Sequence, residues 1–353
     1  MSLSFVDFIK ILGKGKNGSR SLTQEEAYNA MSMILAEQVA PEQLGAFWML
    51  IRMREETVDE AVGFTQAIRQ KLSLQVPSTV DVDWPAYAGK RNELPWFLLA
   101  ALALAQSGVK VFMHGHAFAE EERIYVDQMI SWLGLPIATD QAAAKQQLAQ
   151  TGFAYMPLHT MSPKLAQLMD LKLLLGLRSP VNTLVRLMNP AAATHSVHGV
   201  FHKGYDELHM AAAKRLGDES VLVFRGGNGE AEVNPERDVT LGFLQQGNVS
   251  WDTWPKVALG HCRQKNNLDP QRLLQHWRNA TTDVFGELAV LQTLASVIGL
   301  MNPSYDRETC QQEATRVWQQ RDTQCFTKNL GEVFHTPYSV AKILSAVNSS
   351  LVA

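Results

Sequence analysis

The sequence of 353 residues has few cysteines, no strong excess of either charge and no long apolar run. Its three cysteines, Cys262, Cys310 and Cys325, share no pairing or metal-binding spacing, which predicts reduced thiols and a cytoplasmic location. The net charge is −3, so any site for a polyanion must be a local patch. The longest apolar run, Trp96 to Ala105, is about half of what a bilayer span requires, and no signal-peptide core opens the chain. We therefore expect no membrane association.

Glycine is scarce where an α/β protein usually concentrates it. The stretch PAYAGKRNELPW, residues 85–96, follows a strand-like VDVD and precedes an apolar helical run. Phosphate-binding turns at such a place are rich in glycine, because backbone N–H groups then reach the phosphate without a Cβ in the way. This turn contains Gly89 alone, followed by Lys90 and Arg91. We therefore expect side-chain cations to replace backbone dipoles in this turn.

The first 75 residues have the pattern of a helical domain. Two capping boxes and a helix-opening proline mark its helices: Thr23 with Glu26, Thr57 with Glu60, and Pro41. Residues 47–51, FWMLI, make the middle helix apolar nearly all round, so it should lie in a bundle or an interface. Gly45 would allow another helix to approach closely. We predict that this domain, residues 1–75, joins two copies of the chain in a homodimer.

The remainder, residues 76–353, has the pattern of an α/β domain. Strand candidates alternate with helical runs: VDVDW, VKVFMHG, HSVHGVFH and SVLVFRGG. This alternation predicts a mostly parallel sheet with helices on both faces. A long helical segment at residues 163–189 interrupts it, and we expect that segment to pack back onto the N-terminal helices. From Asp269 onward the pattern is helical again.

Four stretches stand in the order found in one enzyme family: LTQEEAYNAMSMILAEQVAPEQLGAFWMLIRMREET, SGVKVFMHGH, LGLRSPVNTLVRLMNP and VLVFRGGNGEAE. The chain resembles the anthranilate phosphoribosyltransferases of glycosyltransferase family 3, which are grouped with the class III nucleoside phosphorylases. The resemblance extends from Phe5 to Ile343. It implies a small helical domain joined to a larger α/β domain, with a ligand cleft between the two.

The resemblance also implies which residues line that cleft. Five positions match the family's cleft motifs: Gly89, His114, Gly115, Asn182 and Glu232. In the family, a glycine turn at the position of AYAGKRN cradles the diphosphate of phosphoribosyl pyrophosphate. An Asp-Glu pair near the fourth stretch binds magnesium, and an arginine near the position of Lys172 grips the carboxylate of anthranilate.

Several residues depart from these motifs. Three side chains crowd the place of the diphosphate cradle: Tyr87, Lys90 and Arg91. Met113 replaces the lysine of the family's Lys-His-Gly-Asn-Arg turn, and the acidic run Glu120–Glu122 replaces phosphate-binding serines. Ala231 replaces the aspartate of the magnesium pair, so Glu232 remains with Glu230 as a partial substitute. We therefore expect no cofactor; Mg²⁺ would be the cofactor only if the protein is a transferase.

Basic residues form three local patches that predict an anion-binding surface: Lys14, Lys16 and Arg20; Lys90 and Arg91; and Lys172 and Arg178. The alternative for each patch is ordinary solvated charge. A diverged branch of the family lacks the glycine cradle, has an Asn-Gly-Glu turn like GNGE at residues 227–230, and is associated with nucleic-acid binding instead of catalysis. This chain resembles that branch, which implies nucleic acid, with single strands favoured, as its partner.

The roles of aromatic and histidine side chains stay open. Three aromatic residues near the loop would either stack unpaired bases or pack the helix start onto the sheet: Trp84, Tyr87 and Trp96. His114 is either a cleft residue or a satisfied structural histidine. His195, His198 and His202 lie close together but lack the ligand spacing of a zinc site.

The sequence thus leaves three functions open. The leading hypothesis is a non-catalytic or weakly catalytic relative that binds single-stranded nucleic acid. The second is a transferase acting on a different phosphoribosyl or nucleoside substrate, for which Glu230 and Glu232 would replace the metal pair and a small phosphoribosyl ligand would be the partner. The third is an anthranilate phosphoribosyltransferase with an atypical site.

Overall fold

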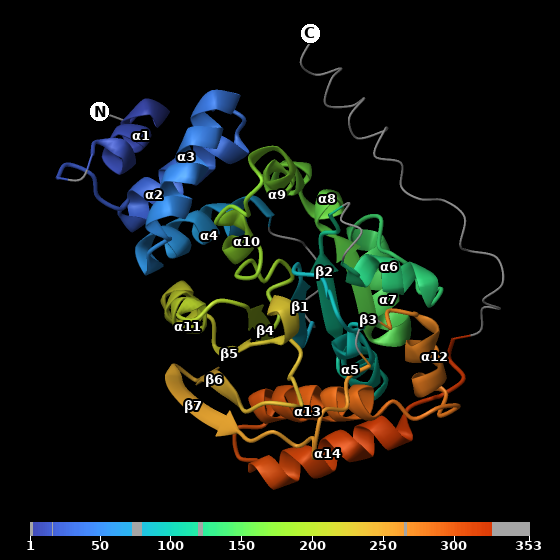
Figure 1. Ribbon diagram of the computed structural model, residues 1–353. Coiled ribbons are helices and arrows are strands. Elements are labelled where there is room, and N and C mark those ends of the chain that lie inside the picture. The colour runs from blue at the N-terminus through green and yellow to red at the C-terminus, as the bar shows by residue number, and fades with distance from the viewer. Residues whose placement is uncertain (1–2, 16, 73–79, 119–122, 265–266, 327–353) are drawn as a thin grey trace.

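The computed structural model describes residues 3–15, 17–72, 80–118, 123–264 and 267–326. Its N-terminal part is helical (Figure 1), and its helices are α1 Phe5–Gly13, α2 Gln24–Leu35, α3 Pro41–Arg54 and α4 Val58–Leu72. The predicted capping box at α2 is confirmed, because Thr23 Oγ1 accepts a hydrogen bond from the N–H of Glu26 and the Glu26 carboxylate accepts one from the N–H of Thr23. Pro41 opens α3 as predicted. These local signals fix where the helices begin.

A single sheet forms the centre of the larger part. Its strands lie in the order β3-β2-β1-β4-β5-β6-β7. The strands from β3 to β5 in this order run parallel to one another, whereas β6 runs antiparallel to both of its neighbours, β5 and β7. The strands are β1 Val82–Ala86, β2 Val111–Gly115, β3 Phe153–Pro157, β4 His195–Val200, β5 Ser220–Arg225, β6 Val239–Gln245 and β7 Asn248–Trp254. The expected fold class, a small helical domain with a mostly parallel α/β domain, is confirmed.

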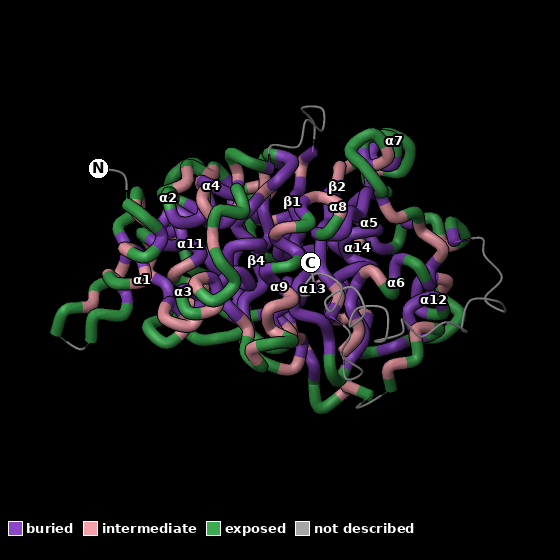
Figure 2. The backbone as a smooth tube through the Cα atoms, turned by 90° about the horizontal axis from the view of Figure 1, so that it is seen from above, coloured by how far each residue is buried: buried purple, intermediate pink, exposed green. Residues whose placement is uncertain are grey.

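Helices cover both faces of this sheet (Figures 1 and 2). One face packs against the apolar helices α5 Trp96–Gln106 and α13 Val284–Met301, backed by α6 Val126–Trp132, α12 Gln271–Trp277 and α14 Arg307–Gln320. The opposite face packs against α7 Gln141–Thr151 near β2 and β3, and against α11 Tyr205–Leu216 near β4 and β5. Alternate side chains of each strand thus enter opposite cores, as period-two geometry requires.

The segment after β3 contains three helices, α8 Leu158–Met161, α9 Pro163–Leu175 and α10 Val181–Leu184. Their buried side chains belong to the same apolar cluster as those of α1 to α4. The cluster also takes in Tyr87, Phe118 and Tyr125, which follow β1 and β2. The helical part and the ends of the strands therefore share one core.

Helix α13 is long and apolar enough to cross a bilayer by length and composition. Two thirds of it is buried inside the protein, where it packs against α5 and α14. A buried core helix has the same composition as a membrane span, so this pattern alone does not distinguish the two.

Candidate functional site

The candidate site lies where the loop after β1 meets the turn after β5. The strands β1, β4 and β5 are parallel neighbours, so their carboxyl ends open on the same edge of the sheet. The loop at residues 87–93 and the turn at residues 226–232 therefore come together, although they lie far apart in the sequence. Contacts between the two decide what the site can hold.

Glu230 occupies the backbone donors of the loop. Its Oε1 accepts hydrogen bonds from the N–H groups of Ala88, at 2.8 Å, and Gly89, at 2.6 Å. The carboxylate is buried, and this burial raises the pKa of Glu230, whereas the nearby Arg186 and the two N–H donors favour its charged form. The amides that would face an external anion thus already hold an internal one.

Lys90 forms a buried ion pair with Glu232. Only 2% of Lys90 is exposed, and its Nζ contacts Glu232 Oε1. The other oxygen, Oε2, accepts a hydrogen bond of 3.0 Å from the N–H of Phe97 in the first turn of α5. The sequence predicted one anion-binding patch at Lys90 and Arg91. In the structure Arg91 is exposed, but Lys90 points inward because Glu232 satisfies its charge, so Lys90 is not part of an exposed patch.

Gly89 is required by the close packing of the loop. Its φ is +68°, and a Cβ at this position would lie 2.7 Å from the ring of Tyr125. The loop is further held by two backbone hydrogen bonds of 2.8 Å between Lys90 and Ile124. The glycine therefore serves the packing of the loop against residues 123–125, in addition to exposing its own N–H to Glu230.

Four cations surround the loop, and we call them the basic cluster: Arg91, Arg123, Lys172 and Arg178. Arg123 donates hydrogen bonds to the carbonyl oxygens of Ala88 and Gly89, and Arg178 donates one to that of Ala88. Burial, together with the positive charges of Arg178 and Arg91, lowers the pKa of Lys172 to about 8. The same repulsion acts on Arg123. Two patches predicted from the sequence, at residues 90–91 and 172–178, thus meet in the fold.

Arg123 was missed by the sequence reasoning. It follows the acidic run Glu120–Glu122, which was interpreted as a replacement of phosphate-binding serines that would repel a phosphate, and residues 119–122 lie outside the described residues. The only signal for it was a cation close to the family's phosphate-binding stretch. Its contact with the loop depends on the tertiary fold.

The third predicted patch is separate. Lys14 and Arg20 lie near the end of α1, at the outer edge of the helical part (Figures 1 and 2). Arg20 forms a two-pronged ion pair with Glu26, at 2.6 and 2.7 Å. Lys16 lies outside the described residues. The fold does not bring Lys14 and Arg20 to the basic cluster.

The predicted cleft histidine is a buried structural residue. His114 Nδ1 lies 2.6 Å from the hydroxyl of Tyr87, and its Nε2 lies 3.1 Å from Asp83 Oδ1. Gly115 pairs with Ala86 on β1. Asn182 is buried at the start of α10, where its amide donates to the carbonyl oxygen of Ser179. Each of these matched positions is engaged within the protein.

Base stacking by the three aromatic residues near the loop is excluded by their burial. Trp84, Tyr87 and Trp96 are each 0% exposed. Trp84 stacks on Phe97, and Trp96 packs edge-on against His276. Their role is the alternative one, packing the helix start onto the sheet.

The described residues contain no group of three or more histidine, cysteine or acidic side chains that could hold a metal ion. His195 bonds Ser220, and His198 packs edge-on against His209 in the interior. His202 is exposed at the end of β4. Glu230 and Glu232 have separate partners, so binding a metal between them would require breaking those contacts.

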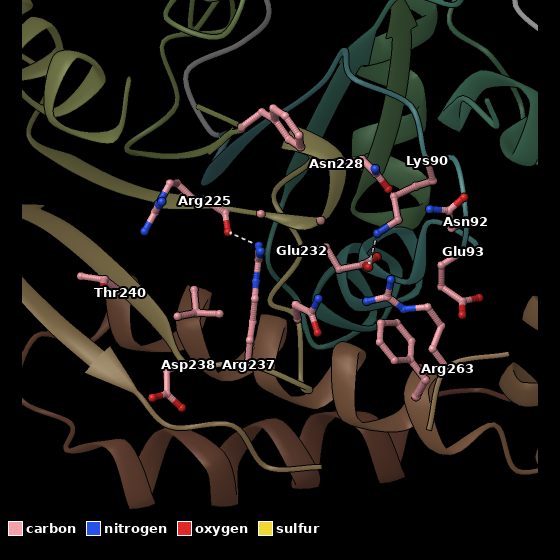
Figure 3. Close-up of a pocket in the computed structure, with 16 residues that line it drawn as sticks. Lys90, Asn92, Glu93, Arg225, Asn228, Glu232, Arg237, Asp238, Thr240 and Arg263 are labelled. Carbon is pink, nitrogen blue, oxygen red and sulfur yellow. Dashed lines mark hydrogen bonds and ion pairs between the residues drawn. The ribbon is translucent and has the colours of Figure 1, made fainter. Parts of the chain in front are cut away.

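Two cavities adjoin the turn at residues 226–229. The larger, of about 300 Å³, is polar and extends from the loop after β1 to the start of β6 (Figure 3). Its lining includes Lys90, Asn92, Arg225, Glu232, Arg237 and Arg263. The smaller, of about 90 Å³, lies between the helical part and α11, beside Arg178, Arg186 and Glu56. Burial raises the pKa of Glu56, which accepts hydrogen bonds from Thr183 and Tyr205.

Comparison with known proteins places this arrangement in a family. The model of the helical bundle domain of the glycosyl transferase family matches residues 6–72, and the model of its a/b domain matches residues 97–260. The chain belongs to this family. Its relatives include the anthranilate phosphoribosyltransferase of Geobacillus kaustophilus, 32% identical over 243 residues, which are 68% of this chain and 70% of the relative. That of Geobacillus sp. strain WCH70 is 31% identical over 296 residues, 82% of this chain and 83% of the relative.

Solved structures of this glycosyl transferase family share the fold. Anthranilate phosphoribosyltransferase from Thermus thermophilus has a TM-score of 0.74 and 21% identity, covering 88% of this chain and 94% of its own. The enzyme from Saccharomyces cerevisiae, in complex with PRPP and Mg, has a TM-score of 0.72 and 14% identity, covering 89% of this chain and 93% of its own. At these identities the likeness establishes the fold alone.

Proposed function

We propose that this member of the family no longer transfers phosphoribosyl groups and instead binds single-stranded nucleic acid at the basic cluster. The observation that carries the proposal is the internal occupation of the phosphate turn by Glu230. The N–H groups of Ala88 and Gly89, which stand at the position of the family's diphosphate cradle, bond a buried carboxylate. A diphosphate would have to displace that carboxylate and would meet its negative charge.

The Lys90–Glu232 pair supports the same conclusion. Glu232 stands at the position of the family's second magnesium carboxylate, yet it neutralises Lys90 and accepts from Phe97. Removing one partner of a buried ion pair costs about 3–5 kcal/mol, so recruiting Glu232 for a metal would be unfavourable. With Ala231 beside it, Glu232 has no aspartate to share a cation.

The basic cluster supplies the charge for a polyanion. Burial and the positive charges of Arg178 and Arg91 lower the pKa of Arg123 and of Lys172, so the four cations lie within electrostatic reach of one another and would all attract a phosphate. Arginine binds phosphate through a planar fork, and Arg91 is the exposed arginine next to the loop's glycine turn. Because the whole protein is slightly acidic, this local binding should weaken steeply as salt rises.

Titration of a labelled single-stranded oligonucleotide at two salt concentrations tests the proposal. The variant Arg91→Ala with Lys172→Ala should bind at least tenfold more weakly and with a salt slope lower by about 1 to 2. Lys90 is left intact because it is structural. The matched control, Lys10→Ala with Arg316→Ala, removes two exposed cations from other surfaces and should leave both quantities unchanged. Equal affinity of the cluster variant and the wild type would rule out this binding surface.

The alternative is a transferase with another phosphoribosyl or nucleoside substrate. It is favoured by the similarity of the chain to relatives that are named as phosphoribosyltransferases. For this activity Glu230 would have to leave the loop and join Glu232 at a metal. Phosphoribosyl pyrophosphate with magnesium, added as a competitor, distinguishes the two. Saturable binding of the competitor, with no oligonucleotide binding, would support the transferase and contradict our proposal.

The homodimer through the helical domain and the cytoplasmic location stay predictions. Val6 on α1 and Met53 on α3 are exposed apolar side chains on that domain, and Met53 is 78% exposed. Such side chains are candidates for a contact between two copies.

A further inference from the structure

The larger cavity has the features of a second anion site, on the other side of the turn at residues 226–229 from the basic cluster. It is bounded by residues 90–93 after β1, the turn after β5, the segment leading into β6, and Phe285 in the first turn of α13. Figure 3 shows Arg237 between two groups of lining residues, with Thr240 and Asp238 on one side and Lys90, Asn92 and Arg263 on the other. Three arginines line this cavity. Arg225, at the end of β5, stands in one of the stretches that carry the family resemblance, whereas Arg237 and Arg263 lie outside those stretches.

The acidic side chains of the lining are already engaged. Glu232 is paired with Lys90, and Glu93 is paired with Arg272 at 3.2 Å. Asp238, at the exposed rim, accepts a hydrogen bond of 2.9 Å from the N–H of Lys256. The carboxylates therefore do not neutralise the centre of the cavity.

Arg237 lacks an acidic partner among the residues that the structure describes. Its guanidinium donates one hydrogen bond, of 3.0 Å, to the carbonyl oxygen of Arg225. Partial burial and the positive charges of Arg225 and Arg263 lower the pKa of Arg237. Arg263 itself lies over the ring of Phe285 at 5.0 Å, and its buried Nε has no hydrogen-bond partner within the described part of the chain. Arg225 is paired with Asp206 at 3.7 Å, and Arg263 with Glu236 at 3.5 Å. Among the described arginines of the lining, Arg237 is therefore the one without a carboxylate partner, and an anion in the cavity would stabilise its charge.

The remaining lining indicates which anion. Phe201 is 60% exposed and offers an aromatic face, and Asn92 offers amide donor and acceptor groups. Arginine forks recognise phosphate, aromatic faces stack bases, and carboxamides bond base edges. A volume of about 300 Å³ lies at the lower end for a small-ligand site, which suits one nucleotide and not a longer oligomer.

We infer that this cavity binds a single nucleotide, with its phosphate on Arg237 and its base toward Phe201. The nucleotide is either free or the terminal unit of a strand, and the recognition chemistry is the same for both. The terminal-unit form rests on the proposed nucleic-acid binding; the free form does not. Since Asn228 accepts a hydrogen bond of 3.4 Å from the N–H of Arg91, the turn links this cavity to the basic cluster.

Calorimetric titration with adenosine and uridine 5′-monophosphates tests the inference. At least one should bind the wild type in the millimolar range or tighter, and Arg237→Gln should weaken that binding at least tenfold, the loss of one charge-assisted contact. Arg316→Gln, on the outer face of α14, is the matched control and should bind as the wild type does. Thr240→Trp, on the exposed rim in β6, should also block binding by filling the cavity, which provides a second variant should Arg237→Gln unfold the protein.

Further arms identify the ligand. Adenosine without phosphate should bind at least tenfold more weakly than its monophosphate, and inorganic phosphate more weakly than either nucleotide. If oligonucleotides with a 5′-phosphate bind more tightly than those with a 5′-hydroxyl, and Arg237→Gln abolishes the difference, the nucleotide is a strand end. If only the free nucleotides respond to Arg237→Gln, it is a free nucleotide.

Two results would overturn the inference: no binding of either monophosphate at millimolar concentration, or equal binding by the wild type and Arg237→Gln. Failure of the nucleic-acid proposal is distinguishable, because Arg91→Ala with Lys172→Ala acts on the basic cluster and leaves the nucleotide titration unchanged. Inorganic phosphate binding as tightly as the nucleotides would contradict the assignment of a base position.

Discussion

Glu230 and Glu232 are two residues apart, yet they satisfy different groups of the same loop. Glu230 bonds the backbone of Ala88 and Gly89, whereas Glu232 neutralises Lys90 and caps the start of α5. Together they make this loop a closed, internally bonded structure. The chemistry of the site therefore depends on which of these contacts a ligand could replace.

A double-mutant cycle on Lys90 and Glu232 measures that closure. Lys90→Met should lower the free energy of unfolding by about 3 kcal/mol or more, because it leaves the Glu232 charge buried without its partner. The double variant Lys90→Met with Glu232→Gln should be more stable than the sum of the two single losses predicts, since neither charge then remains. Urea unfolding gives these values. The exposed pair Lys10–Asp7 is the control, and Lys10→Met should cost less than about 1 kcal/mol. Additive losses at Lys90 and Glu232 would contradict the pairing.

At the scale of helices and strands, local signals in the sequence carried most of the fold. The strands β1, β2, β4 and β5 were predicted from short β-branched runs bounded by turns, and α12, α13 and α14 from their helical periodicity. The hairpin of β6 and β7 was missed, although Gly247 is a local signal for its turn. Gln246 and Gly247 both have positive φ in the structure, as a two-residue hairpin turn requires, and glycine adopts this conformation readily. Strand β3 was also missed, because its five residues, FAYMP, include no β-branched side chain.

The candidate site was less predictable for a physical reason. That Lys90 is a cation is visible in the sequence, but its direction depends on Glu232, which lies 142 residues later. Gly89 and its partner Glu230 are likewise 141 residues apart in the sequence. Only the tertiary pairing of β1, β4 and β5 brings these residues together. Charge alone therefore predicted an anion-binding patch where the fold forms a buried pair.

The packing of α2 against α4 depends on Gly63, and the expected role of Gly45 is absent within the described part of this chain. A Cβ on Gly63 would lie 2.1 Å from the carbonyl oxygen of Gln24, whereas a Cβ on Gly45 meets nothing within 4 Å. We expect Gly63→Ala to lower the free energy of unfolding by about 1–3 kcal/mol through overpacking. Gly45→Ala, at a partly exposed position in α3, should raise it by up to about 1 kcal/mol through helix propensity. Thermal unfolding of both variants checks this; a stabilising Gly63→Ala would show that the two helices have room.

The contact of β4 with α11 should make stability depend on pH. His198 on β4 packs against His209 on α11, and burial lowers the pKa of His198 to about 3 and that of His209 as well. The positive charges of Arg69 and Arg186 near His198 act in the same direction. In the unfolded chain both histidines regain a pKa near 6.5, so protonation favours unfolding. The stabilisation that the two neutral histidines give the folded protein is present above pH 6.5. It is lost as the pH falls from 6.5 toward their lower pKa values in the folded state.

Between pH 7 and pH 5 this loss should reach about 2 kcal/mol for His198, and the loss at His209 has the same sign. The measurement is the free energy of urea unfolding at pH 7, 6 and 5. The variant His198→Leu with His209→Leu should lose correspondingly less stability over the same interval. An identical pH dependence in the variant and the wild type would mean that other groups account for the acid sensitivity.

On the scale of the whole molecule, the helical part and the α/β part should unfold together. They share the apolar cluster that includes Tyr87 and Tyr125, and Arg69 on α4 joins them through two hydrogen bonds to Asp218, at 2.7 and 2.8 Å, and two more to the carbonyl oxygen of Leu187. We expect amide hydrogens of α2 and α4 to exchange with the same free energy as those of β1 and β5, because the apolar cluster of the helical part is built from side chains of both parts.

Arg69→Met tests this coupling. It removes a partly buried, charge-assisted link and should lower the exchange free energy of both parts equally, by about 1.5–3 kcal/mol. The matched control is Arg215→Met, which breaks an exposed ion pair between α11 and Asp59 of α4 and should cost less than about 1 kcal/mol. If the amides of α2 and α4 exchanged at a lower free energy than those of β1, in the wild type or in Arg69→Met, the helical part would be opening by itself. The cleft between the two parts would then be a moving surface, and the closed loop at its floor would be the fixed part of the site.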